Sequence, residues 1–150
     1  MILRVAIELD LFEIISKKSH FNTPNHHGYL SASEIASHLP IKSPRKAPET
    51  LERLLRSLAN FNILECKQGA AGGGGGGGGG ERWLYGLAPL VSKYFVCDHN
   101  GVSLAPLLLF AQDKVVTESW YHMKDAILEG GVPFNKAHGM DAFEYPTKDI

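Results

Sequence analysis

Apolar residues follow a helical spacing from Met1 to Lys18. They form two adjacent stripes, one of Ile2, Val5, Leu9 and Phe12 and the other of Ile7, Leu11, Ile14 and Ile15. A helix with two neighbouring apolar faces is buried on more than one side. We therefore expect one continuous, buried helix over 1–18, followed by a polar loop over 19–29.

The next segment carries signals that begin and end helices. Ser31 and Glu34 stand in SASE at the spacing of a capping box, in which each side chain pairs with a backbone N–H group of the other residue. A short helix is expected from this box to the residue before Pro40. Pro48 suits the first turn of a second helix that runs to Asn60, with an inner face of Leu51, Leu54, Leu55 and Leu58.

Two short alternating segments, 62–67 and 81–86, flank an uninterrupted glycine run from Gly72 to Gly80. They predict a β-hairpin with a long tip, the alternative being a loop on both sides. The resulting order of helix, helix, helix and hairpin is that of a winged helix.

The remainder of the chain is predicted to be helical. Residues 88–95 predict a short helix, and residues 104–129 predict the longest helix of the chain, with apolar residues on two stripes. Gly130 and Gly131 predict its end. Short helical turns are expected at 133–139 and 141–145.

Composition narrows the class of protein. The 150 residues carry 15 Lys and Arg against 16 Asp and Glu, so the basic excess of a nucleic-acid-binding domain is missing. The most apolar stretch, 104–111, is shorter than the about 20 apolar residues that span a bilayer. Glu8 and Asp10 argue against a secretory signal. Cys66 and Cys97 lack metal-site spacing and predict two reduced, buried thiols in a cytoplasmic protein.

A winged helix first suggests DNA binding, with 48–60 as the recognition helix. The basic residues that could contact phosphates and bases are Arg45, Lys46, Arg53 and Arg56. However, Glu49 stands four residues before Arg53, the spacing and order that pair charges along a helix surface. Glu52 and Arg56 repeat this arrangement. A structural or dimerising winged helix is therefore the stronger hypothesis.

Few residues point to catalysis or to metal binding. The glycine run precedes a predicted strand and not a helix, so it does not fit a dinucleotide-binding loop. No metal-binding or nucleophilic motif includes the adjacent His26 and His27. The same holds for the polar residues of the predicted long helix, which are Asp113, Glu118, His122 and Asp125. Six residues of this part of the chain could line an apolar cavity that has a few polar groups. The alternative is that they form a plain helical core. They are Gln112, Trp120, His122, Phe134, Met140 and Phe143.

Several long segments occur in the order found in one enzyme family. They are MILRVAIELDLFEII, LSASEIASHLP, LERLLRSLANFNIL, RWLYGLAP, QDKVVTESWYHMKDAILEGGVPFNKAHGM and DAFEY. Together they resemble the amino-terminal part of plant caffeic-acid-type O-methyltransferases, which use S-adenosylmethionine (SAM). The resemblance covers nearly the whole chain outside 22–29 and the glycine run.

The resemblance implies a mainly α-helical fold with a small β-hairpin. Residues 1–95 are expected to form a winged-helix-like domain that makes a homodimer, with the glycine-rich wing tip at 72–80. Residues 96–150 are expected to form a helical extension that contributes to a phenolic substrate pocket and is truncated at 150. We expect the family's Rossmann-like domain, with its cofactor loop and general-base histidine, to be absent from these 150 residues. We therefore expect this chain to bind no SAM, although intact family enzymes do, and to be inactive alone.

The family's substrate-binding positions fall on Phe110, Ala111, Val116, Ala142, Phe143 and Pro146. The resemblance places Met1 where it reaches across the dimer into the partner's pocket. Close relatives usually have methionine at position 110, asparagine at 111 and histidine at 146. Ala111 cannot offer the amide hydrogen bond that asparagine offers to a ring substituent.

The leading hypothesis is therefore the dimerisation and substrate-wall part of an O-methyltransferase. The intact relative transfers a methyl group from SAM to a phenolic hydroxyl of phenylpropanoid type. A non-catalytic dimerising protein that pairs with full-length homologues is the alternative, and a winged-helix DNA binder is a third. Neither nucleic acid nor a membrane is an expected partner.

Overall fold

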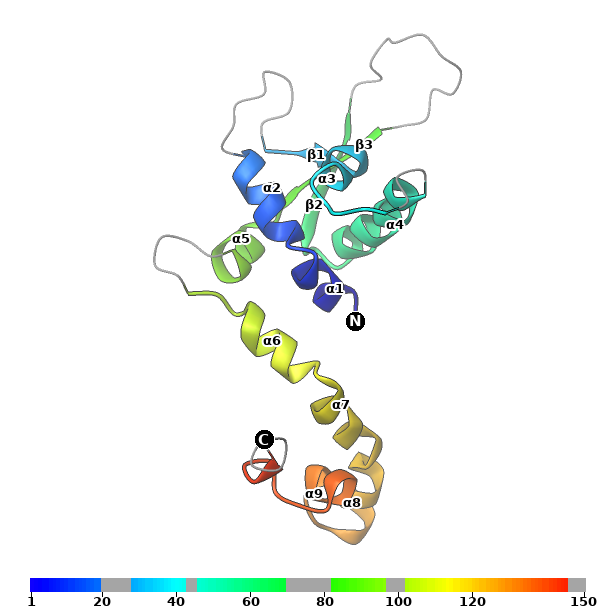
Figure 1. The fold of residues 1–150 in the computed structure, drawn as a ribbon, viewed down its shortest axis with the longest axis vertical. Coiled ribbons are helices and arrows are strands. Elements are labelled where there is room, and N and C mark those ends of the chain that lie inside the picture. Colours follow the sequence, from blue (N-terminus) through cyan, green and yellow to red (C-terminus); the bar gives the residue numbers. More distant parts are fainter. Residues whose placement is uncertain (20–27, 43–45, 70–81, 97–101, 146–150) are drawn as a thin grey trace. The chain divides into compact units, whose positions relative to one another are not determined.

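The computed structural model describes residues 1–19, 28–42, 46–69, 82–96 and 102–145. It divides the chain into two compact units, Met1–Ala105 and Pro106–Ile150 (Figure 1). The glycine run, His26, His27, Arg45, Cys97 and Pro146 lie outside the described residues. Each unit is described by itself below.

The first unit begins with two helices, α1 (Ile2–Glu8) and α2 (Leu11–Ser19), so the expectation of one continuous helix is wrong. Asp10 separates them with a left-handed backbone, φ 52°, which Asp tolerates better than most residues with a Cβ atom. The break also changes the burial of the predicted stripes. Phe12 is buried as expected, whereas Val5 and Leu9 are 39% and 36% exposed.

A winged helix follows, as predicted. Its elements are β1 (Leu30–Ser31), α3 (Ala32–Ala36), α4 (Ala47–Asn60), β2 (Leu64–Gly69) and β3 (Arg82–Leu87). The capping box is confirmed, since the Ser31 amide donates to Glu34 Oε2 at 2.7 Å and the Glu34 amide donates to Ser31 Oγ at 3.3 Å. Pro48 lies in the first turn of α4, which begins one residue earlier than predicted.

The three strands form an antiparallel sheet in the order β1, β3, β2. The predicted hairpin is confirmed, with a register that runs from Leu64 opposite Leu87 to Gly69 opposite Arg82. The two-residue β1 was not predicted. Cys66 lies on the edge strand β2 and is exposed, so the expectation of a buried thiol is wrong.

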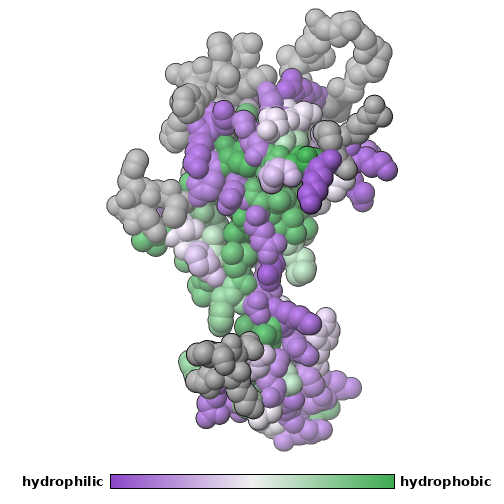
Figure 2. Space-filling view, in the orientation of Figure 1, coloured by the Kyte–Doolittle hydropathy of each residue, from purple (hydrophilic) through white to green (hydrophobic). Residues whose placement is uncertain are grey.

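One hydrophobic core joins these elements to α5 (Pro89–Phe95), which the sequence predicted. Its buried members are Ala6, Leu11, Phe12, Ile15, Ala32, Ile35, Ala36, Leu51, Leu55, Leu58, Leu64, Tyr85, Val91 and Val96. Hydrophobic residues also reach the surface of this unit (Figure 2). No helix in the described part of the chain has the length and apolar content that crossing a bilayer requires.

The expected long helix over 104–129 is three helices, α6 (Ala105–Ala111), α7 (Lys114–Tyr121) and α8 (Met123–Glu129). Asp113 breaks it first, because its extended backbone (ψ 149°) lets it cap α7. His122 breaks it again, with ψ 4°. The predicted stop is confirmed at Gly130, φ 80°. Helix α9 (Pro133–His138) and a turn over 141–145 complete the second unit.

Candidate functional site

The second unit holds most of the predicted substrate-binding residues, and Asp113 fixes where its helix α7 begins. The Asp113 carboxylate accepts a hydrogen bond from the Val115 amide at 2.9 Å, a typical N-cap interaction. The Thr117 hydroxyl donates to the Asp113 carbonyl oxygen at 2.9 Å. Val116 therefore lies in the first turn of a capped helix, half-buried.

Helix α9 packs against α7 through a polar contact. His138 Nε2 donates to the Val115 carbonyl oxygen at 2.9 Å. The buried Ser119 hydroxyl donates within α7 to the carbonyl oxygen of Val116. These bonds hold the Val116 backbone in a defined place relative to α9.

An aromatic cluster connects α9 to the turn over 141–145. The His138 ring lies 4.5 Å from the Phe134 ring and 5.1 Å from the Tyr145 ring, centroid to centroid. Phe134 and Tyr145 meet edge to face at 5.7 Å, a geometry that aromatic pairs favour. The cluster holds the C-terminal end of the turn that carries Ala142 and Phe143.

The turn presents its two predicted site residues outward. The Phe143 amide donates to Asp141 Oδ1 at 2.9 Å, and the Phe143 side chain is 92% exposed. Ala142 is exposed as well. The chain thus holds the turn backbone in place and leaves an aromatic ring free to contact a ligand or another chain.

The second unit contains Phe110, Ala111, Val116, Ala142 and Phe143, whereas Met1 lies in the first unit. Phe110 is 67% exposed at the end of α6, beside the exposed Ala111. Met1 precedes α1 and is 83% exposed.

Other polar residues that the sequence offered as candidates in the second unit make contacts within the fold. Asp113 caps α7, and His122 Nδ1 lies 3.9 Å from Asp125 Oδ2, one turn along the chain. Trp120 is exposed, so the six residues considered for a cavity or a core do not form a closed core in this unit. Among the described residues, no group of three His, Cys, Asp or Glu could hold a metal ion.

Sequence reasoning missed a polar network in the first unit that connects the buried Tyr85 to partly exposed groups on α4. The Tyr85 hydroxyl donates to Glu52 Oε1 at 2.6 Å, and Arg56 Nε donates to the same oxygen at 3.3 Å. The Arg56 guanidinium also lies 5.3 Å from the centre of the Trp83 ring. Burial and the neighbouring Glu52 carboxylate raise the pKa of Tyr85. The helix spacing predicted the Glu52–Arg56 pair, but Tyr85 joins it from β3, far along the chain.

This network bears on DNA binding. An arginine that reads guanine or phosphate needs its guanidinium free for those groups, and Arg56 is engaged by a carboxylate and an aromatic ring. In this structure the Arg56 guanidinium is therefore not free for such a contact.

The described residues do not fit a SAM site of Rossmann type. Such a site places the cofactor at the N-terminus of a helix that follows a parallel strand and a glycine-rich loop. Here all three described strands pair antiparallel, and the strands on either side of the glycine run are hairpin neighbours. No step of a reaction is assigned to a bound cofactor on this chain.

Comparisons with known proteins agree with the fold. The chain is 54% identical over 149 residues to caffeic acid 3-O-methyltransferase 1 of Populus kitakamiensis, a match that covers 99% of this chain and 37% of that protein. It is 51% identical to esculetin O-methyltransferase of Kitagawia praeruptora, with the same two coverages. The chain thus spans about 37% of the length of these curated relatives.

A solved structure and a family profile complete the comparison. Human N-acetylserotonin methyltransferase in complex with SAM superposes with a TM-score of 0.58 at 21% identity, over 97% of this chain and 35% of that one, which shows a shared fold. The profile of the O-methyltransferase dimerisation domain matches residues 1–96, the whole winged helix included. On this match, the chain belongs to the O-methyltransferase dimerisation domain family.

Proposed function

We propose that this chain is the dimerisation and substrate-wall part of a SAM-dependent O-methyltransferase that methylates phenolic hydroxyls. The observation that carries the proposal is the 54% identity to a caffeic acid 3-O-methyltransferase across 99% of the chain. Residues 1–95 serve dimerisation, and residues 96–150 contribute to the substrate pocket. The working form is a homodimer in the cytoplasm.

The substrate wall consists of Phe110, Ala111, Val116, Ala142, Phe143 and Pro146, with Met1 contributed to the partner's pocket. Exposed apolar side chains at Phe110 and Phe143 support this role, because flat hydrophobic surfaces suit a phenyl ring. The wall supplies shape and excludes water. Deprotonation of the phenol and positioning of the methyl donor belong to protein outside this chain.

A chimera tests the proposal. Residues 1–150 replace the matching segment of the Populus kitakamiensis enzyme, and methyl transfer from labelled SAM to caffeic acid and related phenols is measured. We expect turnover by the chimera and none by residues 1–150 alone. A chimera that folds and binds SAM but methylates no phenol would contradict the proposal.

The same chimera tests the wall residues. Phe110→Met with Ala111→Asn restores the amide donor and the slimmer side chain, so the relative kcat/KM for acceptors with a hydrogen-bonding ring substituent is expected to rise about tenfold, the effect of roughly 1.4 kcal/mol. Phe61→Met is the matched control, because Phe61 is exposed in the first unit outside the wall. An equal change in both variants would argue against the assignment.

A further inference from the structure

One side chain of the second unit, His138, contacts two segments that carry residues of the proposed substrate wall. Its Nε2 lies 2.9 Å from the carbonyl oxygen of Val115 on α7, directly before the wall residue Val116. Its ring lies 5.1 Å from the ring of Tyr145, centroid to centroid. Tyr145 ends the turn over 141–145, which carries two further wall residues.

The contact to α7 fixes the backbone beside Val116. A carbonyl oxygen only accepts, so His138 Nε2 carries a proton and donates it. The peptide group that accepts this bond is the one between Val115 and Val116. The next carbonyl oxygen, that of Val116, accepts from the Ser119 hydroxyl. Side chains therefore hold both peptide groups that flank Val116, and one of these side chains comes from another helix.

The contact to the turn is aromatic. The His138 and Tyr145 rings meet at an interplanar angle of 63°. Phe134 packs against both rings, 4.5 Å from His138 and 5.7 Å from Tyr145 between centroids, and tilted or edge-to-face rings attract each other. The Tyr145 amide donates to the Asp141 carbonyl oxygen at 3.1 Å, which ties Tyr145 into the turn. The His138 ring thus helps to fix the end of this turn.

A neighbouring contact of α9 does not involve the wall. Lys136 Nζ donates to Glu129 Oε2 of α8 at 2.7 Å. Neither residue belongs to the proposed wall, and neither does any other residue of α8. Lys136 therefore connects α9 to α8, whereas His138 connects α9 to the two wall segments.

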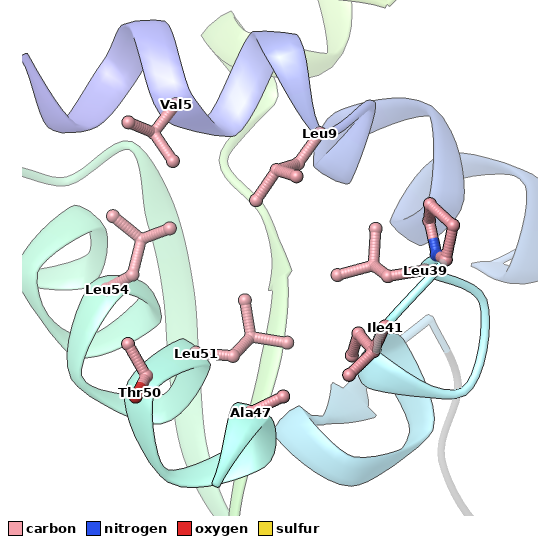
Figure 3. Close-up of a pocket in the computed structure, with 9 residues that line it drawn as sticks. Val5, Leu9, Leu39, Ile41, Ala47, Thr50, Leu51 and Leu54 are labelled. Atoms are coloured by element: carbon pink, nitrogen blue, oxygen red, sulfur yellow. The ribbon is translucent and has the colours of Figure 1, made fainter. Parts of the chain in front are cut away.

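The apolar hollow between α1 and α4 in the first unit is a poorer place for a phenol (Figure 3). Its volume is about 370 Å³, and its lining side chains are apolar except that of Thr50. The Thr50 hydroxyl donates to the Lys46 carbonyl oxygen of its own helix at 3.3 Å. Small-molecule sites combine apolar walls with polar groups that fix the ligand's orientation. The lining of this hollow offers no further polar side chain to a phenolic hydroxyl.

We propose that His138 is a positioning residue of the substrate wall, which holds Val116 and the turn over 141–145 in one arrangement and so sets the affinity for the phenolic acceptor. The inference rests on the proposed function, and His138 acts through its neighbours. Positioning of a substrate is sensitive to small displacements of the groups that hold it. Under the proposed function SAM binds outside this chain, so His138 has no part in its affinity.

Nuclear magnetic resonance of residues 1–150 tests the structural link without any reaction. The Val116 amide nitrogen belongs to the peptide group that accepts the His138 bond. Its resonance is expected to move in His138→Phe and to return in His138→Gln, whose amide nitrogen lies as many bonds from the backbone as Nε2. The Phe143 amide resonance is expected to move with it. A Phe143 resonance that stays in place would overturn the link between the two segments.

Kinetics of the chimera with the Populus kitakamiensis enzyme test the effect on the acceptor. His138→Phe keeps an aromatic ring but removes the donor to the Val115 carbonyl oxygen. It is expected to raise the KM for caffeic acid about fivefold, the scale of one lost hydrogen bond, and to leave the KM for SAM unchanged. His138→Gln is expected to restore the KM for caffeic acid, whereas His138→Asn, one carbon shorter, is not.

Lys136→Met is the matched control, because it breaks the contact of α9 to α8 and leaves both contacts of His138 in place. Its KM for caffeic acid is expected to equal that of the unsubstituted chimera. An equal rise in Lys136→Met and His138→Phe would overturn the proposal, since general loosening of α9 would then be the cause. Circular dichroism confirms that each variant is folded.

The outcomes separate this inference from the proposed function. An unsubstituted chimera that folds and binds SAM but methylates no phenol overturns both. An active chimera whose folded His138→Phe variant keeps its KM for caffeic acid overturns the role of His138 alone. A KM that rises equally for caffeic acid and SAM also overturns it, because the effect would then not be confined to the wall.

Discussion

At the scale of single residues, the first unit is held by polar groups that act across long stretches of sequence. Tyr85 is buried, yet its hydroxyl reaches Glu52 on α4, and the same carboxylate holds Arg56. Tyr29 makes a second such link, because its hydroxyl donates to Glu65 Oε2 at 2.5 Å. The Lys67 ammonium lies over the Tyr29 ring, 3.7 Å from the ring centre.

Tyr85→Phe tests the first link. Loss of the hydrogen bond is expected to lower the free energy of unfolding at pH 7 by about 1 kcal/mol. Because the pKa of Tyr85 is raised in the fold, its neutral form contributes stability fully below about pH 10, the pKa of an unfolded tyrosine. That contribution is lost as pH rises towards the folded value.

Urea unfolding between pH 7 and pH 11 checks this expectation. Tyr85→Phe should flatten the decline in stability above about pH 10, the unfolded phenol's pKa. The Tyr29→Phe variant is the comparison, since the hydrogen bond to Glu65 raises the pKa of Tyr29 as well. If the free energy of unfolding of Tyr85→Phe falls with pH as steeply as that of the wild type, ionisation of the buried Tyr85 phenol is not the cause of the decline.

Position 86 has room only for glycine, because the ring of Tyr29 lies against it. A Cβ atom at position 86 would lie 2.9 Å from Tyr29 Cε1, and the ring is fixed by Glu65 and Lys67. Gly86→Ala is therefore expected to cost about 1–3 kcal/mol of unfolding free energy through overpacking. The same change in a Tyr29→Ala background should cost much less, as a double-mutant cycle by urea unfolding will show. Equal costs in both backgrounds would refute steric conflict as the cause.

At the scale of elements, local signals predicted where several helices begin and end, whereas the breaks inside the two longest predicted helices were missed. The capping box at Ser31, Pro48 in α4 and Gly130 after α8 all act within a few residues, so the sequence alone displays them. The break at Asp10 has no Gly or Pro to signal it, although Asp10 adopts a left-handed backbone there, φ 52°.

The remaining errors have similar physical causes. Asp113 is a good N-cap residue, a signal that the apolar periodicity of 104–129 outweighed. The two residues of β1 are too few to show an alternating pattern. The exposure of Cys66 depends on the order of strands in the sheet, and the His138 contact to Val115 joins positions that periodicity cannot pair.

The capping box of α3 extends to the sheet and gives a prediction at this scale. Arg82 Nη2, on β3, lies 2.9 Å from Ser31 Oγ and 3.0 Å from Glu34 Oε2. Ser31→Ala is expected to lower the free energy of unfolding by about 1 kcal/mol. Burial opposes ionisation of Glu34, but hydrogen bonds from Ser31 and the charge of Arg82 outweigh it and hold the pKa of Glu34 below its usual value.

The lowered pKa fixes the sign of the pH effect. Glu34 contributes stability above its unfolded pKa, about 4.3, and this contribution is lost as pH falls through the lower folded value. Thermal unfolding of the wild type, Ser31→Ala and Glu34→Gln at pH 7 and pH 3 measures it. The stability gap between wild type and Glu34→Gln should narrow at pH 3. A constant gap would show that the ionised carboxylate is not what matters.

At the scale of the whole molecule, the arrangement of strands limits which part of the proposed methyltransferase this chain can supply. Its small antiparallel sheet and its helices present apolar surface, which the proposed function assigns to a partner and to a phenolic ring. They cannot make the parallel strand, glycine loop and helix N-terminus that bind SAM in a Rossmann-type domain. The chain matches about 37% of the relatives' length, which leaves the greater part of such an enzyme to bind SAM.

Calorimetry measures whether residues 1–150 bind SAM. Titration of SAM into residues 1–150 is expected to give only the heat of dilution, because the antiparallel hairpin that flanks the glycine run offers no strand-to-helix turn. Titration into the chimera with the Populus kitakamiensis enzyme should give a binding isotherm with one site per chain. A saturable isotherm with residues 1–150 alone would mean that the cofactor site reaches into this chain, and the assignment of SAM binding wholly to the rest of the enzyme would be wrong.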